Sequence, residues 1–95
     1  MRSRRPAIII LLVACALLLA GSAYADDATE WKLRGDDAMV AGRAAEALEA
    51  YRHAATIEPS PTLDYNIGRA LLAVGELVGA LEAFERYQAT APDAL

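Results

Sequence analysis

The sequence predicts an all-α fold built from two antiparallel helical hairpins, and three observations support this prediction. The segment Ala-Leu-Glu-Ala-Tyr at 47–51 returns as Ala-Leu-Glu-Ala-Phe at 80–84, an offset of 33 in the numbering (80 − 47). Apolar and small residues recur at helical rather than strand spacing. Glycines and prolines divide this pattern into four segments. A fixed period of roughly 30 to 35 residues is typical of stacked helical repeats that are individually too small to bury their apolar faces.

The four helices are expected at about Ala28–Ala41, Ala44–Ile57, Thr62–Val74 and Leu77–Thr90. Asp26 or Asp27 is placed to cap the first helix, because a carboxylate there accepts hydrogen bonds from amides without an intrahelical partner. Ser60 is expected to cap the third helix, with Pro61 at the first helical position, where the missing N–H costs nothing. A short Pro-Ser-Pro link therefore joins the two hairpins.

Two pairs of glycines also repeat at this offset. Gly42 and Gly75 are expected to adopt left-handed conformations that end the first and third helices. Gly35 and Gly68 lie inside those helices, where glycine costs about 1 kcal/mol relative to alanine. We therefore expect another helix to pack closely against each of them.

The second helix of each hairpin carries an apolar stripe at helical spacing. The stripe consists of Ala47, Leu48, Tyr51 and Ala54 in the first hairpin, and of Ala80, Leu81, Phe84 and Tyr87 in the second. Trp31 is interpreted as a core aromatic of the first helix. Small alanines allow close helix packing, and the aromatic rings are expected to fill the space towards the neighbouring unit.

The N-terminal segment, 1–25, has the organisation of a secretory signal peptide. Arg2, Arg4 and Arg5 precede an apolar run at 7–20, and Ala-Tyr-Ala follows at 23–25. The run is shorter than the roughly 20 residues that a membrane-spanning helix needs. Cleavage after Ala25 would leave 26–95 as one small domain. Two alternatives remain: an uncleaved anchor, or lipidation at Cys15, which ends a lipobox-like Leu-Val-Ala-Cys.

The mature chain would be strongly acidic. Without the three leading arginines, 6 basic residues remain (9 − 3) against 13 acidic ones, a net charge of −7 (6 − 13). Such a chain repels nucleic acid and anionic lipid, so neither is expected as a partner, and a membrane is expected only if Cys15 is lipidated. Because Cys15 is the sole cysteine, the mature domain would contain no disulfide.

These landmarks together resemble the tetratricopeptide repeat family over nearly all of 28–92. The first copy, about 28–60, matches its motif at Trp31, Gly35, Gly42, Ala47, Leu48, Tyr51, Ala54 and Pro59. The second copy, about 61–93, matches at Ile67, Gly68, Gly75, Ala80, Leu81, Phe84 and Pro92. The chain departs from the motif at Arg34, Ala38, Asp64, Leu71 and Tyr87, and its period is one residue short of the usual 34. The resemblance implies a short right-handed α-solenoid whose first and third helices line a concave groove for a peptide or protein segment.

Helical spacing selects the side chains that would line that groove. From the first helix they are Thr29, Lys32, Asp36, Met39 and Val40, and from the third they are Thr62, Tyr65, Asn66, Arg69, Leu72 and Ala73. Lys32 and Arg69 are candidates to pair with a partner carboxylate, Tyr65 to stack, and Asn66 to bond a backbone amide. The alternative is that these are ordinary solvated helix faces. The carboxylate clamp of some family members is excluded, because Asp36 stands where it needs asparagine.

The sequence does not favour an enzyme. His53 is the only histidine, and no cysteine or serine is placed to act as its nucleophile. Glu46, Glu49, Glu82 and Glu85 fall opposite the apolar stripes, where charge normally means solvation. No metal-spaced cluster, phosphate-binding loop or nucleophile elbow occurs, so neither a metal nor another cofactor is expected.

The expected function is a non-catalytic scaffold or adaptor exported from a bacterial cytoplasm to the periplasm, in an envelope complex. The alternatives are a lipid-anchored structural subunit held through Cys15, a small regulator of a partner enzyme, or a fragment of a longer array. Two repeats are fewer than such arrays usually need. The apolar side of the last helix, with Leu81, Phe84 and Tyr87, is therefore a candidate face for self-association into a homodimer.

Overall fold

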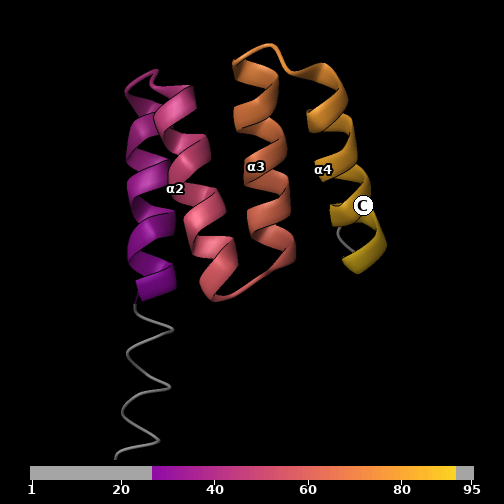
Figure 1. Cartoon of the computed structure of the whole chain (residues 1–95), viewed down its shortest axis with the longest axis horizontal. Coiled ribbons are helices and arrows are strands. Elements are labelled where there is room, and N and C mark those ends of the chain that lie inside the picture. The colour runs from indigo at the N-terminus through magenta and orange to yellow at the C-terminus, as the bar shows by residue number, and fades with distance from the viewer. Residues whose placement is uncertain (1–26, 92–95) are drawn as a thin grey trace, which may run out of the picture.

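The computed structural model describes residues 27–91, and in these residues it contains four helices and no strand. A leading helix covers 27–40 and is followed by α2 (Ala44–Ile57), α3 (Pro61–Ala73) and α4 (Leu77–Thr90). Figure 1 shows them side by side in one row, each antiparallel to the one before, with the leading helix and α4 at opposite ends. The all-α prediction is confirmed. The predicted signal peptide at 1–25, Cys15 and the end of the second repeat lie outside the described residues.

Both hairpin turns are closed by the predicted glycines. Gly42 and Gly75 have φ values of 78° and 85°, in the left-handed region that only glycine adopts without strain. At the end of the leading helix, the Arg43 N–H donates to the Ala38 carbonyl at 2.8 Å and the Gly42 N–H to that of Met39 at 3.1 Å. This is the Schellman arrangement, which satisfies two carbonyls at a helix C-terminus. The end of α3 repeats it at the equivalent positions, from Glu76 to Leu71 (2.9 Å) and from Gly75 to Leu72 (3.1 Å).

The start of α3 follows the predicted capping chemistry. The Ser60 side chain accepts a hydrogen bond from the Leu63 N–H at 3.2 Å, and Pro61 occupies the first turn. The helix therefore begins at Pro61, where the capping prediction placed its first residue, one residue before the approximate start at Thr62. Of the two residues predicted to cap the leading helix, Asp27 is already helical, and Asp26 lies outside the described residues.

Each mid-helix glycine is covered by an aromatic ring of the next helix, as expected. A Cβ atom built on Gly35 would lie 2.5 Å from Cε1 of Tyr51, and one on Gly68 would lie 2.6 Å from Cε1 of Phe84. No side chain fits at either position without displacing the ring. The two glycines therefore set the distance between the helices of each hairpin.

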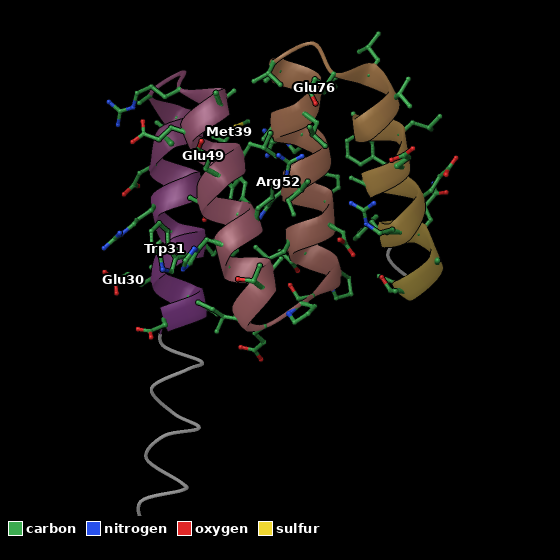
Figure 2. The ribbon with its side chains drawn as sticks, in the orientation of Figure 1. Glu30, Trp31, Met39, Glu49, Arg52 and Glu76 are labelled. Carbon is green, nitrogen blue, oxygen red and sulfur yellow. The ribbon has the colours of Figure 1, made fainter. Side chains whose placement is uncertain are left out.

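The core extends across all four helices. It consists of Ala38, Ala47, Leu48, Tyr51, Ala54, Leu63, Ile67, Ala70, Leu71, Ala80 and Ala83, with Trp31, Met39, Ala55 and Phe84 packed against it. The four glutamates predicted to be solvated, Glu46, Glu49, Glu82 and Glu85, are exposed. Figure 2 also shows Glu30 pointing away from the other helices, on the free side of the leading helix.

The two predicted stripes differ in burial. The α2 stripe is buried throughout, and Leu48 is 7% exposed. Its counterpart Leu81 is 59% exposed. The reason is position in the row: α2 lies between the leading helix and α3, whereas α4 is the last described helix (Figure 1).

Candidate functional site

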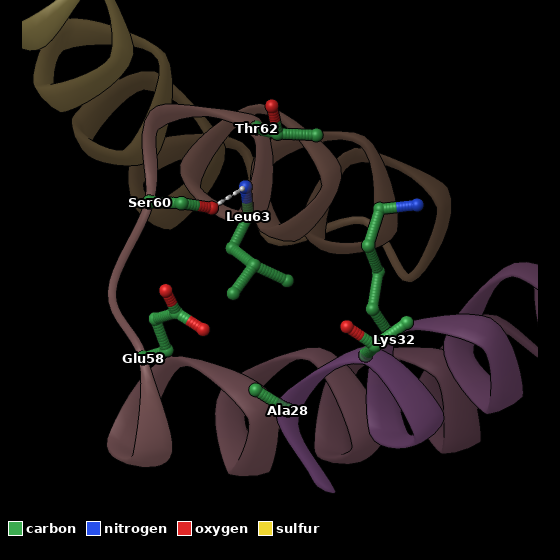
Figure 3. Close-up of a pocket in the computed structure, with 7 residues that line it drawn as sticks. Ala28, Lys32, Glu58, Ser60, Thr62 and Leu63 are labelled. Carbon is green, nitrogen blue, oxygen red and sulfur yellow. Dashed lines mark hydrogen bonds between the residues drawn. The ribbon is translucent and has the colours of Figure 1, made fainter. Parts of the chain in front are cut away.

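Two hollows lie between the leading helix and α3, and we call this side of the molecule the interhelix face. The first has a volume of about 290 Å³ and sits at the start of both helices. It is lined by Ala28, Thr29, Lys32, Glu58, Ser60, Thr62 and Leu63. In Figure 3 the Leu63 side chain points into this hollow, with Glu58 and Ala28 opposite. The lining combines an apolar floor with hydroxyl and charged groups at its edges.

The second hollow, about 260 Å³, lies further along the same two helices. It is lined by Asp36, Met39, Val40, Tyr51 and Arg69. Lys32 lines the first hollow and Asp36 the second, and the two form an ion pair with 2.9 Å between Nζ and Oδ2. The two hollows are therefore linked along the leading helix by this ion pair.

Asp36 is the centre of a hydrogen-bonded group at the second hollow. Its Oδ1 accepts a hydrogen bond of 2.6 Å from the Tyr51 hydroxyl, and its Oδ2 accepts the bond from Lys32. Tyr51 is only 2% exposed, so its hydroxyl reaches from the core up to the carboxylate. The leading helix and α2 are thereby tied together beside the hollow.

This arrangement shifts the pKa values of both Asp36 and Tyr51. Partial burial alone would raise the pKa of Asp36. The hydrogen bonds from Tyr51 and Lys32, with the charges of Lys32 and Arg69, outweigh that effect and hold the pKa below its usual value. Burial raises the pKa of Tyr51, and the hydrogen bond to the Asp36 carboxylate and its negative charge raise it further. Asp36 is therefore ionised and Tyr51 neutral at ordinary pH.

Arg69 supplies the cationic group of the second hollow. It is exposed on α3 and has no hydrogen bond or ion pair within the described part of the chain, although its charge is felt by Asp36 and Tyr51. Lys32, in contrast, is already engaged with Asp36. Of the two cations predicted to bind a partner carboxylate, Arg69 is the one whose guanidinium retains all its donors.

Seven of the predicted groove residues line the two hollows: Thr29, Lys32, Asp36, Met39, Val40, Thr62 and Arg69. Tyr65, Asn66, Leu72 and Ala73 line neither. Tyr65 instead lies towards α4, with its ring centroid 5.8 Å from that of Phe84 and 5.3 Å from that of Tyr87. Leu72 is exposed near the second hairpin turn.

The three residues predicted for self-association do not form one exposed face. Leu81 is exposed, but Phe84 and Tyr87 are half-buried. The Phe84 ring covers Gly68, and the Tyr87 ring packs on Tyr65. The large apolar side chains that α4 exposes are Leu77, Val78 and Leu81.

Tyr51 and Glu58 belong to the hollows but were absent from the groove predicted from sequence. A signal for Tyr51 is present in the repeat itself. The second copy has Phe84 in its place and Arg69 in place of Asp36, so the hydroxyl and its acceptor are both missing there. This paired difference between two otherwise similar copies indicates that the two side chains interact.

His53 takes part in an aromatic contact on the other side of the first hairpin. Its ring centroid lies 4.1 Å from that of Trp31, and the Arg34 guanidinium carbon lies 4.6 Å from the Trp31 ring centroid. Within residues 27–91, no group of three or more His, Cys, Asp and Glu residues is placed to hold a metal ion. The described surface presents apolar contacts, hydrogen-bonding groups and charge at the two hollows.

No family model, curated protein or solved structure matches this chain. Among the described helices, none has both the length and the apolar character needed to cross a membrane.

Proposed function

We propose that this protein is a non-catalytic interaction module, a two-repeat right-handed solenoid of the tetratricopeptide kind, that holds a peptide or protein segment along its interhelix face. It carries no chemistry of its own and works as a scaffold or adaptor in a bacterial cell envelope. The supporting features are the repeat of residues, turns and glycine–aromatic contacts at one constant offset, and the two hollows between the first and third helices.

The observation that carries the proposal is the second hollow. Met39 and Val40 offer apolar surface beside the Asp36 carboxylate and the Arg69 guanidinium. A few fixed polar groups within an apolar concave surface are typical of sites that bind and orient a ligand. The Tyr51 hydrogen bond fixes the Asp36 side chain before any partner arrives, so little conformational entropy is lost there on binding.

The charges at this hollow indicate what kind of segment fits. Asp36 is neutralised by Lys32, whereas Arg69 has no direct partner within 27–91. A carboxylate placed at Arg69 would form a charge-assisted hydrogen bond. The proposed ligand is therefore an extended segment that carries an acidic residue next to apolar ones.

Export is proposed from the sequence at 1–25, with the mature chain in the periplasm. The lipid-anchored alternative differs in one observable property. Intact-mass analysis of the protein from its own cells gives a chain beginning at Asp26 if the segment is cleaved, or a lipidated Cys15 at the N-terminus if the protein is anchored.

Binding is tested with a random peptide library displayed against the purified protein. We expect the selected peptides to share an acidic residue beside apolar ones. Arg69→Glu should weaken their binding by about tenfold or more, because a hydrogen bond to a charged group contributes about 1.5–3 kcal/mol and 1.4 kcal/mol corresponds to tenfold. Fluorescence anisotropy of labelled peptides measures the change in Kd.

Arg52→Glu is the matched control for this experiment. Arg52 is an exposed arginine on α2 that lines neither hollow and has no ion pair in the described residues. Its replacement changes the net charge equally and should leave the Kd within about twofold. Equal weakening by the two variants, or selection of peptides without acidic residues, would contradict the proposal.

A further inference from the structure

The interhelix face carries one charge of each sign without an ion pair, and the two lie at different hollows. Arg69 lines the second hollow and forms no ion pair within residues 27–91. Glu58 lines the first hollow, and its carboxylate forms none in this part of the chain either. The Lys32–Asp36 pair that links the hollows is neutral. The face is therefore dipolar, with its negative end at the first hollow.

The surroundings of Glu58 strengthen this negative end. Glu58 is the C-cap of α2, where the last carbonyl groups have no helical partner and the helix dipole is negative. The last turn of α2 contains no basic residue to balance that charge. Among the lining residues only Lys32 is cationic, and its ammonium donates to Asp36. In Figure 3 the Glu58 carboxylate faces Leu63 across the hollow, whereas the Lys32 ammonium points away from Glu58.

Two helix N-termini, which are positive, also border the first hollow, but each has its own compensation. Asp27 lies in the first turn of the leading helix, and the Ser60 hydroxyl accepts the hydrogen bond of the Leu63 N–H at 3.2 Å. The hollow thus combines an apolar floor with a carboxylate at its edge. A side chain with a hydrocarbon stem and a terminal cation matches both features, which is the chemistry of Lys and Arg.

The separation of the hollows sets the spacing of two charges in a bound segment. The leading helix and α3 run in the same direction, and each borders both hollows. At about 1.5 Å per residue, the step from Thr62 to Arg69 along α3 is about 10 Å, and that from Thr29 to Met39 along the leading helix is about 15 Å. An extended segment rises roughly 3.3 Å per residue with alternating side chains, so residues four positions apart lie about 13 Å apart on the same side.

Building on the peptide binding proposed above for the same face, we propose that the first hollow binds a Lys or Arg side chain of the bound segment, four positions from the acidic residue at Arg69. The interhelix face then selects dipolar segments over segments that are only acidic. The two charges also fix the register, because a shift of one residue would turn both side chains away from the face.

The test uses the full chain and three labelled peptides that share one glutamate and the same apolar residues. The spaced peptide has lysines four positions before and after the glutamate, so that either chain direction places one lysine at Glu58. The adjacent peptide is its isomer, with both lysines next to the glutamate, and has the same net charge. The glutamine peptide is the spaced peptide with glutamine in place of both lysines. The spaced peptide should bind about three- to fivefold more tightly than its isomer at low salt, the range of an exposed ion pair.

Glu58→Lys should weaken binding of the spaced peptide by about five- to tenfold, because repulsion replaces attraction, and that of the glutamine peptide by less than about twofold. This variant should fold, since a basic residue is favourable at a helix C-terminus. Glu49→Lys is the matched control, because Glu49 is exposed on α2, lines neither hollow and has no ion pair in the described residues. It changes the net charge equally and should leave each Kd within about twofold.

Equal affinity for the spaced and adjacent peptides, or equal effects of Glu58→Lys and Glu49→Lys, would overturn the cation site at the first hollow. Arg69→Glu separates that failure from a failure of the proposed function. If Arg69→Glu still weakens binding of all three peptides, binding at the interhelix face stands and only the role of the first hollow is lost. If it changes none of the three Kd values, both proposals fail.

Discussion

Replacing Gly35 with alanine is expected to lower the free energy of unfolding by about 2 kcal/mol, the balance of overpacking against helix propensity. The new Cβ would lie 2.5 Å from the Tyr51 ring. That ring is buried and its hydroxyl is held by Asp36, so it cannot turn aside without losing the hydrogen bond. Overpacking typically costs about 1–3 kcal/mol, the weakened hydrogen bond adds to this, and the gain in helix propensity offsets about 1 kcal/mol. Urea titration followed by circular dichroism measures the difference.

Gly68→Ala is the matched comparison. Its Cβ would lie 2.6 Å from the Phe84 ring, but Phe84 is only half-buried and has no hydroxyl to anchor it. The ring can move towards solvent. The expected loss in the free energy of unfolding is therefore between about 0 and 1 kcal/mol once the gain in helix propensity is included. Equal destabilisation by the two substitutions would show that the Tyr51 anchor is not responsible for the rigidity at Gly35.

Tyr51→Phe is expected to lower the free energy of unfolding by about 1–2 kcal/mol at neutral pH, the contribution of one hydrogen bond to a charged group. The substitution removes the 2.6 Å hydrogen bond to Asp36 and leaves the ring in place over Gly35. Hydrogen bonds to charged groups contribute about 1.5–3 kcal/mol. We expect a loss near the lower end of this range because Asp36 is partly exposed and keeps its bond to Lys32.

The effect of Tyr51→Phe should depend on pH in both directions. The folded-state pKa of Asp36 is lowered, so the ionised carboxylate stabilises the fold. This stabilisation is present above the unfolded-state pKa near 3.8 and is lost as the pH falls below that value. The pKa of Tyr51 is raised, so the neutral hydroxyl stabilises the fold. This stabilisation is complete below about pH 10 and is lost as the pH rises above that value. The difference between wild type and variant should be greatest between these limits.

Tyr65→Phe serves as the control for this pH series. The Tyr65 hydroxyl has no hydrogen bond within the described residues, and the residue is exposed. Removal of this hydroxyl should change the free energy of unfolding by less than about 0.5 kcal/mol. This small change should be the same at acid and neutral pH. A Tyr51→Phe difference that stays constant from pH 3 to pH 8 would contradict the role of the Asp36 carboxylate.

The turns and the pairing of helices were predictable because local chemistry specifies them. Left-handed backbone at Gly42 and Gly75 and the Ser60 cap depend on a few adjacent residues. The contact of Gly35 with the second helix was also predictable, because a glycine inside a helix is tolerated where another helix approaches closely. These local features predict the two hairpins, and the prediction does not require knowing how the hairpins pack on each other.

The position of side chains around the helices was less predictable. Leu81 and Phe84 fall on neighbouring parts of one stripe, and sequence spacing alone does not say which of them faces α3. Tyr65 was expected in the groove, but its ring packs on Phe84 and Tyr87 because aromatic contact stabilises it there. Burial also depends on a helix's place in the row, which is why Leu48 and Leu81 differ so widely.

The most direct test of the proposed function is photo-cross-linking in cells that make the protein, with a photoreactive residue at Met39 of the second hollow. A matched position is Glu49, which is exposed on α2 and lines neither hollow. We expect position 39, but not position 49, to give a light-dependent product with a distinct protein, and Arg69→Glu in the same chain to reduce it. Identical products from both positions, or a product at 39 that Arg69→Glu leaves unchanged, would contradict binding at the interhelix face.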